Sequence, residues 1–189
     1  MFGAHDPDWQ ADLARVGQSR AMFKEQSLWA ISVYRFGRRV DRLPQGLRRR
    51  ILTQVYWFLF RMVETVTGIS LPKSCTIGKG LRIWHFGGVF VHGEAVLGIN
   101  CTLRQGVTIG NRVEDGAAPI VGDNVEFGAY AQVLGDVVIG DNCKIGAMAV
   151  VLTDIPPGAT AVGQPARIAT KHSTSIPLLE SMRSAGTGG

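Results

Sequence analysis

A six-residue period runs through the middle of the chain and constrains its fold more than any other feature. An apolar residue recurs at Ile77, Ile83, Val91, Leu97, Leu103, Ile109, Val121, Phe127, Val133, Ile139, Ile145 and Val151. A second small or apolar residue stands two positions before each, at Cys75, Leu81, Val89, Ala95, Cys101, Val107, Pro119, Val125, Ala131, Val137, Cys143 and Ala149. Because six is even, both positions face the same side of an extended chain, whereas a helical period would scatter them. The period therefore predicts short strands joined by turns.

Hexads of this type stack as a parallel β-helix, in which each coil buries its apolar residues against the next. The 24 glycines of the 189-residue chain support this fold, because most lie between Gly68 and Gly163 and suit repeated tight turns. We therefore predict a mainly β fold with a β-helix over residues 71–168. Residues 1–70 read as an N-terminal helical segment and residues 169–189 as a C-terminal tail rich in Ser and Gly.

The helical segment divides into three stretches. We expect Asp8 to cap a first helix, and two more helices over residues 27–42 and 47–67, separated by Pro44 and Gly46. The last of them carries an apolar stripe at helical spacing, made of Ile51, Val55, Phe58, Leu59 and Met62. Such a stripe marks a core, an oligomer interface or a membrane surface, and the spacing leaves these three open.

The net charge of +5 is concentrated in the same segment, at Arg35, Arg38, Arg39, Arg42, Arg48, Arg49 and Arg50. We expect a solvated helix face and no nucleic-acid partner, and we keep peripheral contact with an anionic membrane as an alternative. The most apolar run, residues 51–66, is too short and too polar to span a bilayer.

Cysteine usage points to a reducing compartment. The three cysteines form no C-x-x-C pair, and their odd count without a signal peptide favours free thiols and a cytoplasmic location. No zinc motif, phosphate loop or dinucleotide fingerprint is present, so we expect no bound metal.

The hexad frame breaks at two places. Two extra residues bulge out around residues 85–88, and residues 111–118 carry no apolar pair and read as a loop that leaves the β-helix. In a solenoid, departures from the repeat mark where function is attached. These two breaks are the first candidates for a site.

Three stretches carry a family resemblance: GISLPKSCTIGKGLRIWH (68–85), the hexads from Ala95 onward, and IGAMAVVLTDIPPGATAVGQPARI (145–168). Together they resemble the serine acetyltransferases and the related acetyltransferases of exopolysaccharide clusters. The resemblance implies a left-handed β-helix with three hexads per coil. It also implies acetyl-CoA as co-substrate with no permanently bound cofactor, and a homotrimer or dimer of trimers whose sites lie between neighbouring β-helices.

The resemblance also assigns roles to residues. His85 matches the general base that takes the proton from the acceptor hydroxyl, and imidazole suits that task near neutral pH. His92 is expected to line the substrate channel or to be structural, and Arg112, Glu114 and Asp115 are expected to contact the acceptor from the loop. Coenzyme A would contact Gly128, Ala129, Gly146, Ala147, Gly163, Arg167 and Lys171.

Departures from the family pattern concern the acceptor. Ser70 and Trp84 stand where the serine acetyltransferases carry aspartates near the base, and Ala117 and Ala118 replace the Arg and His that help hold serine. An amino-acid carboxylate is best held by Arg, so this loss weakens the case for serine. The sequence thus predicts an acetyl-CoA-dependent O-acetyltransferase with L-serine as acceptor by resemblance. The alternatives are acetylation of a sugar or exopolysaccharide hydroxyl, and a non-catalytic β-helix scaffold.

Overall fold

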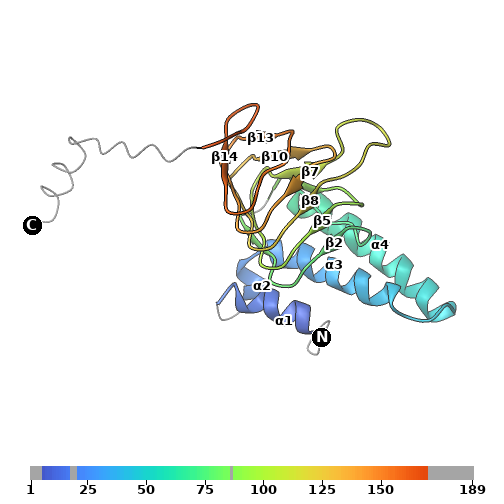
Figure 1. Cartoon of the computed structure of the whole chain (residues 1–189). Coiled ribbons are helices and arrows are strands. Elements are labelled where there is room, and N and C mark those ends of the chain that lie inside the picture. The colour runs from blue at the N-terminus through green and yellow to red at the C-terminus, as the bar shows by residue number, and fades with distance from the viewer. Residues whose placement is uncertain (1–5, 18–20, 86, 170–189) are drawn as a thin grey trace, which may run out of the picture.

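The structure, a computed structural model, describes residues 6–17, 21–85 and 87–169. Short strands wind in stacked coils through the C-terminal part of the chain, and the helices gather at the end where the first coils begin (Figure 1). The helices therefore sit beside the part of the β-helix that carries His85, and the last coils lie farther away.

The helices are α1 (Pro7–Ala14), α2 (Ala21–Lys24), α3 (Ser27–Asp41) and α4 (Leu47–Thr67). The bounds of α3 and α4 agree with the predicted helices to within one residue. The predicted cap of the first helix is wrong, because Asp6 rather than Asp8 is the N-cap and accepts from the backbone N–H groups of Asp8 and Trp9. Pro7 explains this shift of two residues, since its fixed φ and missing N–H suit the first helical position and so make Asp6, the residue before it, the cap.

The strands form three sheets, in which parallel strands from successive coils are hydrogen-bonded. Sheet A contains β1 (Ile69–Ser70), β4 (Val89–Val91), β7 (Thr108–Gly110), β10 (Gln132–Leu134) and β13 (Val150–Val151). Sheet B contains β2 (Thr76–Ile77), β5 (Val96–Leu97), β8 (Ile120–Val121) and β11 (Val138–Ile139). Sheet C contains β3 (Arg82–Trp84), β6 (Thr102–Arg104), β9 (Glu126–Phe127), β12 (Lys144–Ile145) and β14 (Thr160–Val162), with β15 (Arg167–Ile168) antiparallel at its edge. The chain visits sheets B, C and A in turn, so the predicted parallel β-helix is confirmed.

The apolar positions of the hexads form the core of the β-helix. Every main position and every position two residues before it is buried. The buried side chains of the coils form one hydrophobic cluster with Trp9, Leu28, Ile31 and Tyr34 of the helices. The helices are therefore packed onto the β-helix and share its core.

Four successive coils turn from sheet C to sheet A through a corner that we call the C–A corner, formed by residues 85 and 87–88, 105–107, 128–131 and 146–149. Residues 163–166 lie at the next level of this stack, where they join β14 to β15 within sheet C. Non-glycine residues take the left-handed conformation at the C–A corner, with φ of 64° at His85, 60° at Tyr130 and 62° at Met148. This conformation is uncommon for residues with a side chain. Tyr130 and Met148 are held in it by backbone hydrogen bonds to the preceding coil, from the Tyr130 N–H to the Gln105 carbonyl and from the Met148 N–H to the Ala129 carbonyl, both 2.9 Å long. The repeated turn directs these side chains outward.

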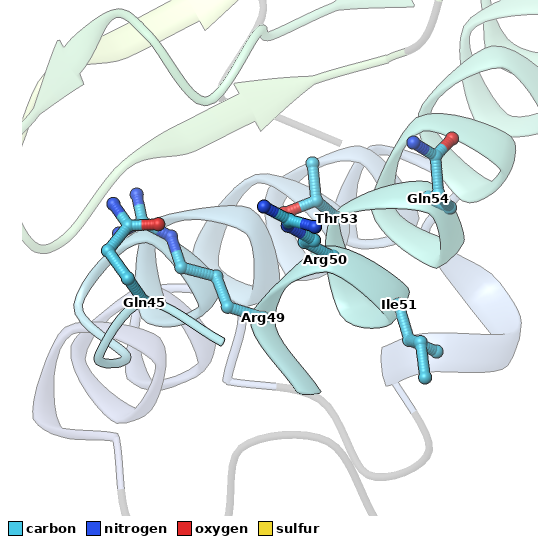
Figure 2. Close-up of a pocket in the computed structure, with 6 residues that line it drawn as sticks. All are labelled: Gln45, Arg49, Arg50, Ile51, Thr53 and Gln54. Atoms are coloured by element: carbon cyan, nitrogen blue, oxygen red, sulfur yellow. The ribbon is translucent and has the colours of Figure 1, made fainter. Parts of the chain in front are cut away.

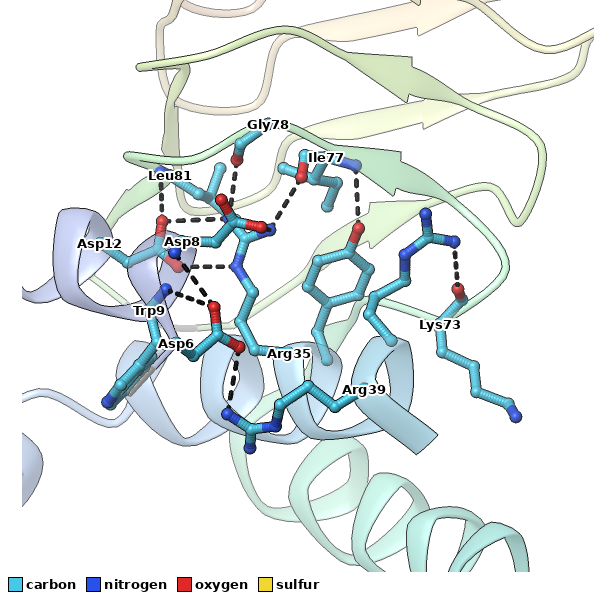
Figure 3. A network of polar contacts seen from close by, with 12 residues as sticks. Asp6, Asp8, Trp9, Asp12, Arg35, Arg39, Lys73, Ile77, Gly78 and Leu81 are labelled. Carbon is cyan, nitrogen blue, oxygen red and sulfur yellow. Dashed lines mark hydrogen bonds and ion pairs between the residues drawn. The ribbon is translucent and has the colours of Figure 1, made fainter. Parts of the chain in front are cut away.

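A buried ion pair anchors the helices to the first coil (Figure 3). Arg35 donates from Nε and Nη2 to the Asp12 carboxylate at 2.8 and 3.1 Å, and from Nη1 and Nη2 to the carbonyls of Ile77 and Gly78 at 2.8 and 2.7 Å. Asp12 Oδ1 also accepts from the Leu81 N–H at 2.8 Å. α1, α3 and the segment that leads into β3 are thus joined through one guanidinium.

The apolar stripe predicted on the last helix does not face the core. Ile51, Val55, Phe58 and Met62 are exposed, whereas Tyr56 and, less completely, Leu59 of the same helix face inward. Tyr56 packs with Phe60 and with Val33, Phe36 and Val40 of α3 in a second hydrophobic cluster. The core reading of the stripe is therefore wrong, because α4 has apolar residues on two faces and the other face meets α3.

Candidate active site

His85 lies at the C–A corner of the first full coil, directly after β3. Its side chain is exposed, and it makes no hydrogen bond or ion pair to any described residue. Neither Ser70 nor Trp84, which replace the family's aspartates, hydrogen-bonds to it. The imidazole is therefore open to a ligand, as a general base must be, and its orienting partner is not among the side chains described in this chain.

Trp84 precedes His85 and presents its indole at the surface of sheet C. The side chain is 43% exposed, and the guanidinium carbon of Arg82 lies 4.2 Å from the ring centroid. Arg82 itself is buried at 3% exposure and reaches Glu25 Oε1 at 3.3 Å. A guanidinium stacked beneath an indole holds the ring in place while the other face of the ring stays accessible.

Two polar side chains next to this position carry unsatisfied atoms. In the described part of the chain, the buried side-chain atoms without a hydrogen-bond partner are Nε and Nη1 of Arg82 and Oε1 of Gln105. Gln105 follows Arg104, which is the register partner of Trp84 in the next coil. Buried polar atoms without partners are rare and need an explanation, and a bound ligand or water would supply it.

The residues predicted to contact coenzyme A lie mainly along the same corner. Gly128 and Ala129, and Gly146 and Ala147, occupy the C–A corners of two later coils, in line with His85. Gly163 follows β14 at the next level of the stack, where its carbonyl accepts from the Val150 N–H. Neighbouring strands are about 4.8 Å apart, so the row from the first coil to the fifth extends over roughly 19 Å. Arg167 lies exposed on β15 at the end of this row, and Lys171 lies outside the described residues.

The glycines of this row have a structural reason of their own. A Cβ at Gly128 would overlap the backbone nitrogen of Ala147, and a Cβ at Gly146 would lie 2.8 Å from Val162 Cγ1. Gly128 is therefore required for close stacking of the coils whether or not a ligand contacts it, whereas a side chain at position 146 would require Val162 to move. The contact of both glycines with coenzyme A stays a prediction.

A cleft of about 390 Å³ opens on the outer face of sheet C beside this row. It is lined by Arg15, Trp84, Thr102, Arg104, Glu126, Phe127, Gly128, Lys144, Ile145, Gly146 and Ala147. Arg15, Arg104 and Lys144 give the cleft a net positive charge although Glu126 also lines it, 4.0 Å from Lys144 Nζ. No role was predicted for these three cations. Arg15 is fixed by bonds to the carbonyls of Gly80 and Asn100, both 2.7 Å long. A cationic cleft next to the row of glycines suits the phosphates of coenzyme A.

The predicted acceptor-contacting residues lie at a different corner. His92 follows β4, and Arg112, Glu114 and Asp115 lie in the loop between β7 and β8, so all four belong to the turns from sheet A to sheet B. Arg112, Glu114 and Asp115 are exposed, whereas His92 is half-buried and its Nδ1 accepts from the Glu94 N–H at 3.3 Å. Within one chain the width of sheet A separates these residues from His85, and the structure does not bring the two groups together.

The cysteines occupy inward hexad positions and are buried. Burial raises the pKa of Cys75 to about 12 and that of Cys101 to about 11. Cys143 Sγ lies 3.1 Å from the carbonyl of Pro156, also inside the coil. Because thiolates are the reactive form, Cys75 and Cys101 are not nucleophiles at neutral pH.

The fold and this cleft define a hexapeptide-repeat transferase, and comparison with known proteins gives the family. The model of bacterial transferase hexapeptide repeats (six repeats) matches residues 118–153. The colanic acid biosynthesis acetyltransferase WcaB of Escherichia coli K12 is 40% identical over 112 residues, which cover 58% of this chain and 69% of that protein. The serine acetyltransferase of Helicobacter pylori 26695 is 39% identical over 132 residues, covering 69% and 77%. Soybean serine acetyltransferase superposes with a TM-score of 0.75 at 31% identity, covering 87% of this chain and 70% of that chain.

This chain belongs to the serine acetyltransferase-like family of hexapeptide-repeat acyltransferases. It is therefore an acetyl-CoA-dependent acetyltransferase, and the non-catalytic scaffold is not retained as an alternative.

Proposed function

We propose that this enzyme transfers the acetyl group of acetyl-CoA to a hydroxyl group, with His85 as general base. The observation that carries the proposal is the exposed His85 imidazole, which shares one corner with Gly128 and Gly146 and lies next to the cationic cleft. An alcohol needs a base to attack a thioester near neutral pH, and a free imidazole is the side chain suited to that role.

The reaction then needs no covalent intermediate on the enzyme. His85 accepts the proton as the acceptor oxygen forms its bond to the thioester carbonyl carbon, and the carbon–sulfur bond breaks as the tetrahedral intermediate collapses. The imidazolium returns the proton to the departing sulfur, so that coenzyme A leaves as a thiol. The raised pKa values of Cys75 and Cys101 agree with direct transfer, because neither cysteine offers a thiolate.

We assign the cleft on sheet C to part of coenzyme A. Arg15, Arg104 and Lys144 line it and would pair with phosphate oxygens. The unpaired Oε1 of Gln105, one coil beyond His85, would accept from an amide N–H of the pantetheine arm or from the acceptor hydroxyl. The contact to Gln105 would give its unsatisfied Oε1 a hydrogen-bond partner.

For the acceptor, the residues around His85 favour a sugar hydroxyl. An indole held by a buried guanidinium offers a flat apolar face with a rigid orientation, which packs well against the C–H groups of a sugar ring. Ala117 and Ala118 offer no charge to a carboxylate. The similarity to the colanic acid acetyltransferase WcaB supports the same class of acceptor.

L-serine is the second candidate, favoured by the similarity to several serine acetyltransferases. Arg112 is exposed in the loop and Arg104 is exposed beside Trp84, so either would have to supply the cation that a serine carboxylate needs. Without such a partner, an entering carboxylate loses hydration without compensation.

We also propose a homotrimer or a dimer of trimers that works in the cytoplasm. The separation of His85 from the loop residues by the width of sheet A supports this assembly, because a neighbouring β-helix could present its loop to His85. Light scattering of the purified protein measures the mass directly, and a monomer at working concentration would contradict the proposal.

The test is release of coenzyme A thiol with a panel of acceptors, including L-serine, monosaccharides and oligosaccharides. We expect His85→Ala to lower turnover at least about 100-fold, the usual contribution of a positioned general base. We expect L-serine to be used about 10- to 100-fold less efficiently than the best saccharide, the effect of one missing charge-assisted contact. Near-normal turnover in His85→Ala would refute the base. High efficiency on L-serine that Arg112→Ala abolishes would make serine the acceptor.

A further inference from the structure

The outer face of α4 is apolar along the whole helix. Besides Trp57, six large apolar residues of α4 are exposed at 38–73%: Leu47, Ile51, Val55, Phe58, Met62 and Val66. At about 100° per residue they fall within an arc of about 100°, so they form one continuous stripe. We call these six residues the α4 stripe. Its length follows the helix of 21 residues, about 31 Å.

Arginines border the α4 stripe on both sides. Arg48 lies at one edge of the arc, and Arg50 and Arg61 lie about 90–110° from its centre on the other side. Arg48 and Arg50 are exposed and form no ion pair with any described residue, whereas Arg61 is paired with Glu64 at 2.8 Å. Glu64 is the one carboxylate of α4. The exposed surface of the helix therefore combines apolar and cationic groups.

A hollow of about 380 Å³ adjoins the start of the helix, lined by Gln45, Arg49, Arg50, Ile51, Thr53 and Gln54. Figure 2 shows the side chains of Gln45, Arg49, Arg50 and Thr53 gathered on one side of the helix. Amide, hydroxyl and guanidinium donors around one hollow suit a phosphate group. Most of the hollow lies on the polar side of the helix, where Arg49 is also 3.7 Å from Asp41, and Arg50 connects it to the border of the α4 stripe.

We propose that α4 lies flat on an anionic membrane surface, with the α4 stripe entering the boundary between headgroups and acyl chains. An interfacial helix has this composition: a long apolar stripe flanked by basic side chains that extend to the phosphates. In the described part of the chain, no helix is long and apolar enough to cross the bilayer. The contact concerns the surface of the membrane, and it is independent of the identity of the acceptor.

A second copy of the chain fits the same face less well. If two α4 stripes packed antiparallel over their full length, with Leu47 opposite Val66, Arg48 would lie opposite Thr65 and Arg50 opposite Val63 of the other copy, so neither arginine would gain an acid. In a parallel pair each arginine would face its own equivalent, and like charges repel. An anionic lipid surface supplies negative charge to every arginine at once, at about 1 kcal/mol per residue.

The experiment is co-sedimentation of the full chain with vesicles, comparing equal parts phosphatidylcholine and phosphatidylglycerol with phosphatidylcholine alone. We expect binding to the anionic vesicles that weakens as salt screens the charges. The double variant Arg48→Gln/Arg50→Gln should bind roughly 30-fold more weakly. The double variant Phe58→Ser/Met62→Ser should bind the anionic vesicles at least about tenfold more weakly, because it removes two apolar side chains from the contact with lipid.

Two matched controls separate the α4 stripe from general surface effects. Lys79→Gln removes an exposed cation outside α4, between β2 and β3, and Val138→Ser removes a side chain that is 46% exposed on sheet B. Both should bind vesicles like the unaltered protein, and circular dichroism should show that all variants are folded.

Three outcomes would overturn the proposal. The first is the absence of binding to anionic vesicles. The second is binding that the Phe58/Met62 variant leaves unchanged, since the contact would then be electrostatic attraction alone. The third is a change in molecular mass of the stripe variants without any vesicle binding, which would make the face an interface between copies. Thiol release from acetyl-CoA in solution is measured separately, so failure here leaves the proposed acetyl transfer standing.

Discussion

Replacing Asp12 by Ala should destabilise the protein more than any surface change on the helices, because it leaves the buried charge of Arg35 without its partner. Asp12 is 0% exposed and Arg35 is 3% exposed, so the guanidinium has no access to water when its partner is removed. Removing one member of a buried ion pair costs about 3–5 kcal/mol. The Leu81 N–H loses its acceptor as well, which adds about 1 kcal/mol or more. We therefore expect Asp12→Ala to lower the free energy of unfolding by about 4–6 kcal/mol.

Urea unfolding followed by far-ultraviolet circular dichroism, at matched protein concentration, measures this change. For a chain of this length the melting temperature should fall by roughly 8–24 °C. Asp12→Asn keeps an oxygen that can accept from the Leu81 N–H, so it should lose less stability than Asp12→Ala. The control is Arg61→Ala, whose pair with Glu64 is exposed and should be worth less than about 1 kcal/mol. If Asp12→Ala cost no more than this control, the pair would not anchor the helices and the reasoning from burial would be wrong.

Three further predictions concern the β-helix. Gly128→Ala should destabilise the protein by about 1–3 kcal/mol or more, because the added Cβ overlaps the Ala147 backbone. Gly110→Ala, whose Cβ would have open space around it, should cost less than half as much, and urea unfolding of both variants measures the difference. Stability should fall as pH rises from about 9 to about 12, because burial raises the pKa of Cys75 to about 12 and of Cys101 to about 11 and these thiols therefore ionise first in the unfolded chain. Melting temperatures measured across this pH range test the prediction, and a melting temperature that does not change with pH would contradict the shifts. An iodoacetamide label should enter these thiols at least tenfold faster in urea than in the native protein, with acetyl transfer unaffected by native treatment; mass spectrometry and thiol release check both.

The β-helix could be predicted from the sequence because its pattern has a simple geometric meaning. A residue at Ile77 and one at Cys75 must face the same side of an extended chain, and the same holds for every later hexad. The frame breaks were equally visible, which is why His85 could be proposed from the sequence and the family. Its exposure and left-handed φ of 64° fit that proposal, and its catalytic role stays a prediction.

The cleft on sheet C could not be predicted in the same way. Trp84 and Arg104 lie side by side only because three hexads complete one coil, and the spacing alone does not say how many hexads do so. Arg15 comes from the far N-terminal part of the chain and reaches the coils at Gly80 and Asn100. A long-range contact of this kind leaves no periodic signal, so its residues appear only when the coils are stacked.

For α4 the apolar pattern in the sequence is strong, but it does not show whether the apolar face points to the core or to the outside. Apolar spacing defines an angle around a helix axis and does not say what lies at that angle. The predicted stripe includes Leu59, which is half-buried, but its other members point outward, while Tyr56 and Phe60 meet α3. A hydrogen bond holds Tyr56 on the inner face, because its hydroxyl accepts from the Lys73 N–H at 2.8 Å and so connects α4 to the turn before β2. With that rotation fixed, the apolar side chains on the opposite face have no partner within the described part of the chain. Their burial has to come from something outside it, and the arginines beside them favour an anionic membrane surface.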